Sequence, residues 1–214
     1  MIISPGRNYI FVHIPKTGGT SLALALEGRA RADDIMMGDT PKAVKRRKRL
    51  KDVRAAGRLW KHSTLADIDG LVAPEFVQGA FVFAMVRNPW NRMVSYYHWL
   101  REQRFDHPAV QLARELEFDE FLREPHTQRT LSSHPYADYM VDAAGAERAS
   151  LYIRLEHFET DAAPLWAHLG FQLELPHENA SDRQGDYRPY YSDATAELVG
   201  SLCQRDITQF QYSF

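Results

Sequence analysis

Cysteine is nearly absent from this sequence of 214 residues, which contains a single one, Cys203. One cysteine cannot form a disulfide within the chain and cannot supply the paired cysteines of a zinc knuckle. Small folds held together by disulfides are therefore excluded. The low cysteine content is typical of a protein that works in a reducing compartment, and we expect a cytoplasmic location.

Long apolar runs are also lacking. The longest, residues 76–86, contains Gln78 and Gly79 and ends before Arg87, well short of the roughly 20 residues that a membrane helix needs. The first residues do not combine a basic segment, an apolar core and a small-residue cleavage site, so no secretory signal is expected. These features predict a soluble protein with no transmembrane segment.

The sequence has little net charge. Its 26 Lys and Arg residues and 28 Asp and Glu residues give a formal net charge of −2, which argues against a globally basic nucleic-acid coat. Hydrophobic residues make up 44% and charged residues 25% of the chain, as in globular rather than disordered proteins. A chain of this length buries about 70% of its unfolded surface. No repeat or linker divides it, so we expect one domain over residues 1–214.

Short apolar runs alternate with segments that favour helix. Residues 9–14 (YIFVHI) and 81–86 (FVFAMV) are expected strands, and the second is apolar throughout, as in a strand buried on both faces of a parallel sheet. Pro89 can begin a helix over residues 90–104. The other expected elements are strands at 59–61 and 151–155 and helices at 21–27, 65–68, 109–117, 119–123, 162–169 and 193–210. This alternation predicts an α/β fold with a central, mainly parallel sheet flanked by helices.

The first candidate site joins the strand at residues 9–14 to the next helix through Pro15-Lys16-Thr17-Gly18-Gly19-Thr20-Ser21. Adjacent glycines let backbone N–H groups approach a phosphate closely, and a helix N-terminus adds N–H donors with partial positive charge. The lysine would supply a mobile cation, and the two threonines and the serine would supply hydroxyl donors. In a Walker A loop the lysine follows the last glycine, so this is a different loop. On the glycine pair alone, an ordinary strand-to-helix turn remains an alternative.

A second candidate site follows the expected strand at residues 81–86, in the sequence RNPWNRMVSYY over residues 87–97. Arg87 comes directly after the strand, at the carboxyl end where open α/β sheets bind ligands. Ser95 lies eight residues further along, in the helix that Pro89 begins. An arginine and a hydroxyl in these places could bind a second phosphate. Taken alone, they could equally be a charge that ends the strand and a residue on the helix surface.

Together the two motifs resemble those of the sulfotransferases that use 3′-phosphoadenosine-5′-phosphosulfate (PAPS), in particular carbohydrate-type family 2. Residues 15–21 match the loop that binds the 5′-phosphosulfate in that family. Its 3′-phosphate motif is matched by Arg87, Pro89, Arg92, Ser95 and Tyr97. The resemblance continues weakly through residues 154–156 and the tyrosine-rich C-terminus. It implies a P-loop-NTPase-like three-layer fold, PAPS as donor, 3′-phosphoadenosine-5′-phosphate (PAP) as product and no metal.

The chemistry of sulfuryl transfer assigns roles to three of these residues. Negative charge grows on the departing 5′-phosphate, and a lysine near its bridging oxygen can stabilise that charge without magnesium. We assign this role to Lys16. A site for the second phosphate would distinguish PAPS from ATP, which has no 3′-phosphate, and we assign Arg87 and Ser95 to it. Arg92 belongs either to that site or to the structure that supports it.

An acceptor hydroxyl must lose its proton, so a general base is expected. The sequence offers nine histidines. His13 is expected to pack within the first strand, and His98 to be structural or on the surface. His62 follows the expected strand at 59–61 and precedes the second motif, an order similar to that of the catalytic histidine in the uronyl 2-O-sulfotransferases. We predict that His62 is the base, with a structural or a substrate-binding histidine as alternatives.

A basic run lies outside both motifs and contains Lys42, Lys45, Arg46, Arg47, Lys48, Arg49, Lys51 and Arg54. Such a run is most often a solvated helix face. It could instead bind an anionic acceptor such as an acidic polysaccharide, or a nucleic acid or anionic lipid. A polar segment at residues 177–191 contains Arg183, Arg188 and a glycosylation sequon at Asn179, and the sequence assigns none of them a contact.

The predicted function is metal-independent, in-line transfer of a sulfuryl group from PAPS to an acceptor hydroxyl on a carbohydrate or glycan-like substrate. Nucleic acid is not the expected partner. Two other classes of function stay open. A P-loop kinase or nucleotidase would show magnesium dependence and ATP turnover. A catalytically silent module would bind PAP or nucleic acid without transferring a group.

Overall fold

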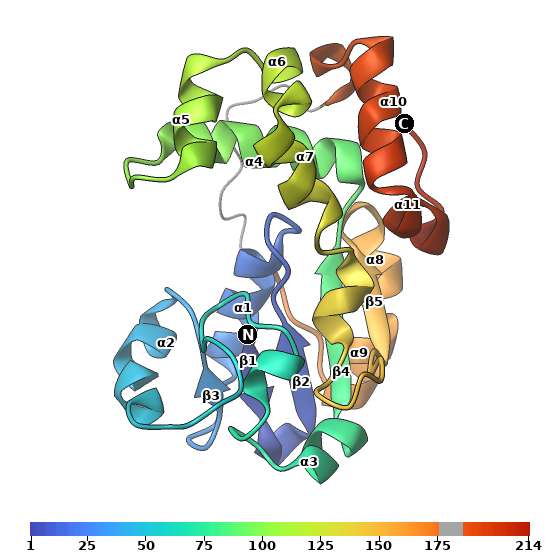
Figure 1. Ribbon diagram of the computed structural model, residues 1–214. Helices are drawn as coiled ribbons and strands as arrows, with labels where there is room; N and C mark the ends of the chain where they lie inside the picture. Colours follow the sequence, from blue (N-terminus) through green and yellow to red (C-terminus); the bar gives the residue numbers. More distant parts are fainter. Residues whose placement is uncertain (176–185) are drawn as a thin grey trace. The chain divides into compact units, whose positions relative to one another are not determined.

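The computed structural model describes residues 1–175 and 186–214. The sequon at Asn179 and Arg183 lie outside the described residues. The chain forms two compact units: residues 1–86 and 136–175 belong to unit 1, and residues 87–135 and 186–214 belong to unit 2 (Figure 1). Whether these units together make the single domain expected over residues 1–214 stays a prediction, and each unit is described by itself below.

Unit 1 contains a sheet of five strands in the order β3-β1-β2-β4-β5. The strands are β1 (Ile2–Ser4), β2 (Tyr9–Val12), β3 (Ile35–Met36), β4 (Phe81–Val86) and β5 (Leu151–Arg154). β4 is parallel to both of its neighbours, β2 and β5, whereas β1 is antiparallel to β2 and β3. The predicted α/β fold is therefore confirmed, with a parallel centre and an antiparallel edge. The edge escaped prediction because β1 and β3 have only three and two residues.

The helices of unit 1 are α1 (Gly19–Gly28), α2 (Pro41–Arg46), α3 (Pro74–Gly79), α8 (Phe158–Asp161) and α9 (Ala163–Leu169). One hydrophobic cluster joins Leu22 and Leu26 of α1 and Leu165 of α9 to Phe11 and Phe83 of the sheet. On the alternate positions of the strands, Val12 and Val82 are also fully buried. Both faces of the central strands are thus covered, as the continuous apolar run at 81–86 predicts.

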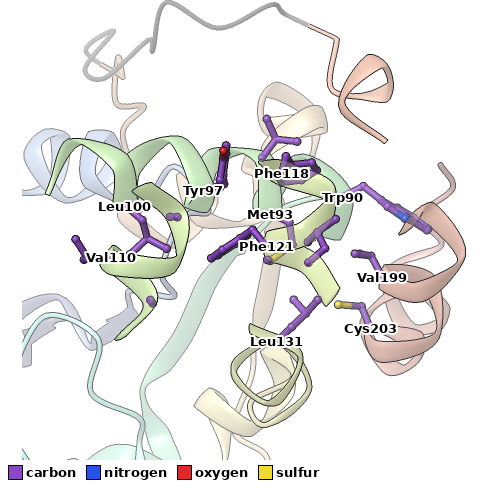
Figure 2. Packing of buried hydrophobic residues seen from close by; sticks show 14 residues of the cluster. Trp90, Met93, Tyr97, Leu100, Val110, Phe118, Phe121, Leu131, Val199 and Cys203 are labelled. Atoms are coloured by element: carbon purple, nitrogen blue, oxygen red, sulfur yellow. The ribbon is translucent and has the colours of Figure 1, made fainter. Parts of the chain in front are cut away.

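Unit 2 is helical and consists of α4 (Pro89–Glu102), α5 (Pro108–Glu115), α6 (Phe118–Arg123), α7 (Pro125–Ser132), α10 (Asp193–Leu202) and α11 (Gln204–Phe210). Figure 2 shows its core, where Trp90, Met93 and Tyr97 of α4 meet side chains of α6, α7 and α10. The single helix expected at 193–210 is wrong. The backbone leaves helical geometry at the buried Cys203, with φ −106° and ψ 20°.

Short 3₁₀ helices complete the described secondary structure, at Pro5–Arg7, Arg47–Leu50, Ala66–Ile68, Tyr136–Met140, Leu155–His157 and Arg188–Tyr190. The strand expected at residues 59–61 is also wrong, because this segment forms bends and turns. Ser63 explains the turn. Its buried hydroxyl lies 2.7 Å from the Arg58 oxygen and 3.0 Å from both the oxygen and the nitrogen of Trp60. A side chain that bonds the neighbouring backbone competes with strand pairing.

Candidate functional site

The loop between β2 and α1 ends in a helix N-terminus. Gly18 adopts a left-handed conformation with φ 84°, and Gly19 is the first residue of α1. The first N–H groups of a helix have no partner within the helix and attract anions. The Thr17 hydroxyl is used inside the loop, since it donates to the Ile14 oxygen at 2.9 Å. Thr17 would therefore meet a phosphate only through its backbone, while Thr20 is exposed and Ser21 half-buried.

Neither glycine of this loop has room for a side chain. A Cβ on Gly18 would lie 2.8 Å from the Leu155 Cδ1, and one on Gly19 would lie 2.7 Å from the His13 Nε2. Gly18 is also in a backbone region that other residues adopt at a cost. The close approach of the His13 and Leu155 side chains thus fixes the backbone that would surround a phosphate. Leu155 belongs to the segment 154–156 in which the family resemblance is weak.

We expect Gly19→Ala to destabilise unit 1 and weaken binding of PAP. The added methyl group meets the buried His13 ring, and overpacking of this kind costs about 1–3 kcal/mol. Gly28→Ala is the matched control, because a Cβ on Gly28 at the other end of α1 meets nothing within 4 Å. Chemical denaturation and calorimetric titration of PAP measure the two effects. Equal behaviour of the two variants would show that the loop is not held as described.

Lys16 has an unusual backbone conformation. Its φ is +66°, a region that is uncommon for residues other than glycine and costs about 1–2 kcal/mol. The side chain is half-buried, and its charge acts on the His13 ring. Backbone strain of this kind collects at functional sites, and the position is the one that the loop motif assigns to the catalytic lysine.

His62 lies next to the strand end that leads into this loop. Its Nδ1 is 2.7 Å from the His13 backbone oxygen. A carbonyl oxygen only accepts hydrogen bonds, so Nδ1 carries the proton in this contact and the lone pair of a neutral ring is on Nε2. The two imidazole rings meet edge to face, with centroids 4.8 Å apart. The structure thus brings His62 together with the first motif, although its position in the chain was all that suggested it.

His13 was expected only to pack within the first strand, yet its ring also lies close to the glycine loop and to His62. It lies one residue beyond β2, it is 7% exposed, and its ring stacks on Phe11 at 5.7 Å between centroids. Burial, helped by the nearby positive charges of Lys61 and Lys16, holds the pKa of His13 well below its usual value. A neutral His13 ring is therefore close to both Gly19 and the His62 ring. A histidine directly before a glycine loop is the signal that could have suggested this contact.

In unit 2, Arg87 and Ser95 lie along one side of α4. The Arg87 Nη2 donates to the Asn91 Oδ1 at 2.8 Å. Asn91 and Ser95 are four residues apart in the helix and therefore share a face. Asn88 caps α4 by accepting from the Trp90 and Asn91 nitrogens. Asn91 thus aligns Arg87 with the face that carries Ser95, a role that the sequence motif does not indicate.

The second motif also contains Tyr97 and Arg92. The Tyr97 hydroxyl donates to the Leu116 oxygen at 2.9 Å and accepts from the Arg101 Nη1 at 2.8 Å. The residue is 2% exposed, so Tyr97 packs in the core. Burial raises the pKa values of Tyr96 and Cys203, and the nearby positive charge of Arg92 partly offsets both increases. Arg92 therefore lies near these two side chains, and whether it belongs to the 3′-phosphate site or to the structure that supports it stays a prediction.

The basic run in unit 1 divides into two sets. Lys42, Arg46, Arg47 and Arg49 each donate a side-chain hydrogen bond to a backbone carbonyl between residues 27 and 38. These four hold α2 and the 3₁₀ helix after it to the end of α1 and the segment that follows. Within the described part of the chain, no ion pair or side-chain hydrogen bond engages the exposed Lys45, Lys48, Lys51 and Arg54.

Residues 1–175 and 186–214 contain neither a membrane-spanning helix nor a cluster of metal ligands. No helix there is long and apolar enough to cross a membrane. No group of three His, Cys, Asp or Glu side chains in this part of the chain is arranged to hold a metal ion. The expectation that catalysis needs no metal stays a prediction.

Comparison with known proteins shows the family of this chain and a solved structure of similar fold. A family model described as "Sulfotransferase family" matches residues 1–212. The crystal structure of mouse sulfotransferase SULT7A1 complexed with PAP superposes with a TM-score of 0.54 at 17% sequence identity. The alignment covers 96% of this chain and 85% of the mouse chain, and at this identity it shows a common fold. Among curated proteins, none matches the sequence.

Proposed function

This chain belongs to the sulfotransferase family, and on that premise we propose that it transfers a sulfuryl group from PAPS to a hydroxyl of a carbohydrate acceptor. The observation that carries the proposal is the contact between His62 and His13, which sets a candidate base against the loop that ends β2. The PAP in the mouse sulfotransferase of similar fold supports PAPS as the donor.

The loop at residues 15–21 suits the 5′-phosphosulfate. Its two glycines leave no side chain between the backbone and an anion, and α1 begins directly after Gly18. Free N–H groups at a helix N-terminus, together with a lysine, are the donor set that a phosphate or sulfate requires. Lys16, Thr20 and Ser21 would add side-chain contacts to those of the backbone.

Arg87 and Ser95 would hold the 3′-phosphate. Arg87 directly follows β4, and the loop at 15–21 follows β2, which pairs in parallel with β4 through Val12 and Ala84. Both motifs therefore follow the carboxyl ends of neighbouring parallel strands, the place where open α/β sheets bind ligands. Asn91 orients the guanidinium, and a planar arginine fork suits a phosphate.

The proposed mechanism uses His62 and Lys16. When bound, PAPS supplies the sulfuryl group, whose bond to the 5′-phosphate oxygen breaks as a bond to the acceptor oxygen forms. His62 accepts the hydroxyl proton at Nε2, the nitrogen that the His13 carbonyl leaves with the lone pair. Lys16 stabilises the charge that the 5′-phosphate gains. Preorganised donors of this kind stabilise developing charge more strongly where water is excluded.

Arg87→Ala should weaken the binding of PAP by about 10- to 100-fold, because a charge-assisted hydrogen bond contributes about 1.5–3 kcal/mol to affinity. The affinity for adenosine 5′-phosphosulfate, which lacks the 3′-phosphate, should stay almost unchanged. Calorimetric titration of both ligands tests the nucleotide part of the proposal. Arg104→Ala, at an exposed arginine just after α4, is the matched control. Equal weakening of both ligands would place Arg87 elsewhere in the nucleotide site, and no binding of PAP by the unaltered protein would contradict the proposed donor.

A further inference from the structure

The ring of His62 is part of a row of aromatic side chains in unit 1. The row begins in the buried core, where the ring centroids of Phe83 in β4 and Phe11 in β2 are 5.3 Å apart. It continues to His13 at 5.7 Å, to His62 at 4.8 Å and to Trp60 at 5.0 Å. The first three of these side chains are at most 7% exposed, whereas Trp60 is 40% exposed. The proposed base is therefore the fourth of five rings, and Trp60 is the last.

A single hydrogen bond does not fix the orientation of an imidazole. The torsion about the Cβ–Cγ bond of histidine is broad and roughly two-fold. Half a turn of the His62 ring would move Nδ1 away from the His13 oxygen, which it contacts at 2.7 Å. The rings of His13 and Trp60 both meet the His62 ring edge to face, at 71° and 89°, an arrangement that aromatic pairs prefer. Packing against two rings therefore opposes rotation of the imidazole.

Trp60 is itself held in place. The buried Ser63 hydroxyl lies 3.0 Å from the Trp60 nitrogen and 2.7 Å from the Arg58 oxygen. The guanidinium carbon of Arg58 lies 5.1 Å from the centre of the indole, which is a cation–π contact. The backbone of the turn and the Arg58 side chain thus fix the indole. Tryptophan is usually well buried in folded proteins, and the contact with His62 accounts for the exposed position of this one.

We propose that Trp60 is a positioning residue for the reaction. It keeps the His62 ring turned so that Nδ1 donates to the His13 oxygen and Nε2 is left to accept the proton of the acceptor hydroxyl. This inference rests on the proposed function, in which His62 is the base. Trp60 acts through His62, with Arg58 as its support. Loss of the indole lets the imidazole turn and lowers the fraction of the protein in which the basic nitrogen is in place.

Nitrogen NMR of the histidines in the full chain tests the orientation of the ring without an acceptor. Above the pH range in which imidazole titrates, the His62 signals, assigned by their loss in His62→Gln, should show a single tautomer with the proton on Nδ1. Trp60→Ala should give a mixture of both tautomers, because the ring leaves the His13 oxygen. Trp60→Phe keeps an aromatic ring and should keep the single tautomer. Phe105→Ala, at a ring of unit 2 that is 49% exposed, is the matched control and should leave the His62 signals unchanged.

A double-mutant cycle tests the consequence for transfer. Turnover is measured as label transferred from PAPS to a panel of glycans, lipids and small alcohols. Trp60→Ala should lower turnover by about 2- to 10-fold, the change that corresponds to the usual strength of one aromatic pair, and Trp60→Phe should recover most of it. In the His62→Ala background, Trp60→Ala should cause no further loss, because the effects of residues that act through one another are not additive. The affinity for PAP should stay unchanged in every variant.

Two results would overturn the positioning role. One is a single Nδ1–H tautomer that persists in Trp60→Ala. The other is a double variant in which the two losses of turnover multiply, because Trp60 would then contact the acceptor or support the fold independently of His62. A tautomer that depends on Trp60, in a protein that transfers no sulfuryl group, would refute the proposed function and confirm that Trp60 holds the ring.

Discussion

Replacing His62 with alanine should lower turnover by about 10²–10⁴-fold, the usual value of a general base, while the affinity for PAP stays unchanged. The reason lies in the contact of Nδ1 with the His13 oxygen, which leaves Nε2 as the basic nitrogen. Imidazole gains a proton between pH 5 and 8, so the activity of the unaltered protein should fall on the acid side. That acid limb should disappear or move in the variant. Steady-state rates over a pH series, with PAP titrated separately, measure both effects.

His62→Gln separates a base from a positioning residue. Glutamine keeps a hydrogen-bonding side chain of similar reach but cannot take a proton, so it should be as inactive as alanine. Recovery of most activity in this variant would mean that His62 only orients the acceptor. Loss of PAP binding or of folding in both variants would instead assign His62 a structural role against His13, and the base would then lie among the carboxylates and the other histidines.

Lys16→Ala should reduce turnover by about 10²–10³-fold, the cost of losing one donor aimed at developing charge. The affinity for PAP should fall far less, because the lysine interacts most strongly with charge that appears as the bond to sulfur breaks. Turnover at saturating PAPS measures the first effect, and calorimetric titration of PAP measures the change in affinity. Near-normal turnover would exclude this role for Lys16.

Lys16→Gly separates the role of the lysine side chain from the strain of its backbone. The φ of +66° is unfavourable for lysine and free of strain for glycine. This variant should keep or raise the free energy of unfolding, by up to about 1 kcal/mol, and still be as inactive as the alanine variant. A fall in stability together with activity would show that the Lys16 side chain supports the fold rather than the reaction.

The sequence predicted the parts of the fold that have a strong local signal. The apolar run of β4 and the helix that Pro89 begins were found within two residues of their observed ends. Hydrophobic periodicity cannot detect strands as short as β1 and β3, whose pairing depends on distant residues. The expected strand around Trp60 failed because Ser63, three residues away, bonds the backbone into a turn.

The candidate site was predictable where residue type and spacing are sufficient. The glycine loop and Arg87 follow strand ends, and a sequence shows this directly. The contacts around His62 depend on a backbone oxygen 49 residues away, and no pattern of residue types encodes such a pairing. For the same reason the roles of His13 and Asn91 emerged only from the three-dimensional arrangement.

The most direct test of the account is transfer of a radiolabelled sulfuryl group from PAPS to a panel of glycans, lipids and small alcohols, in a buffer that contains a metal chelator. We predict labelled saccharide and an equal amount of PAP, with Lys16→Ala almost inactive. Absence of transfer to every acceptor, by a protein that still binds PAP, would contradict the account. Magnesium-dependent turnover of ATP in place of PAPS would contradict it equally.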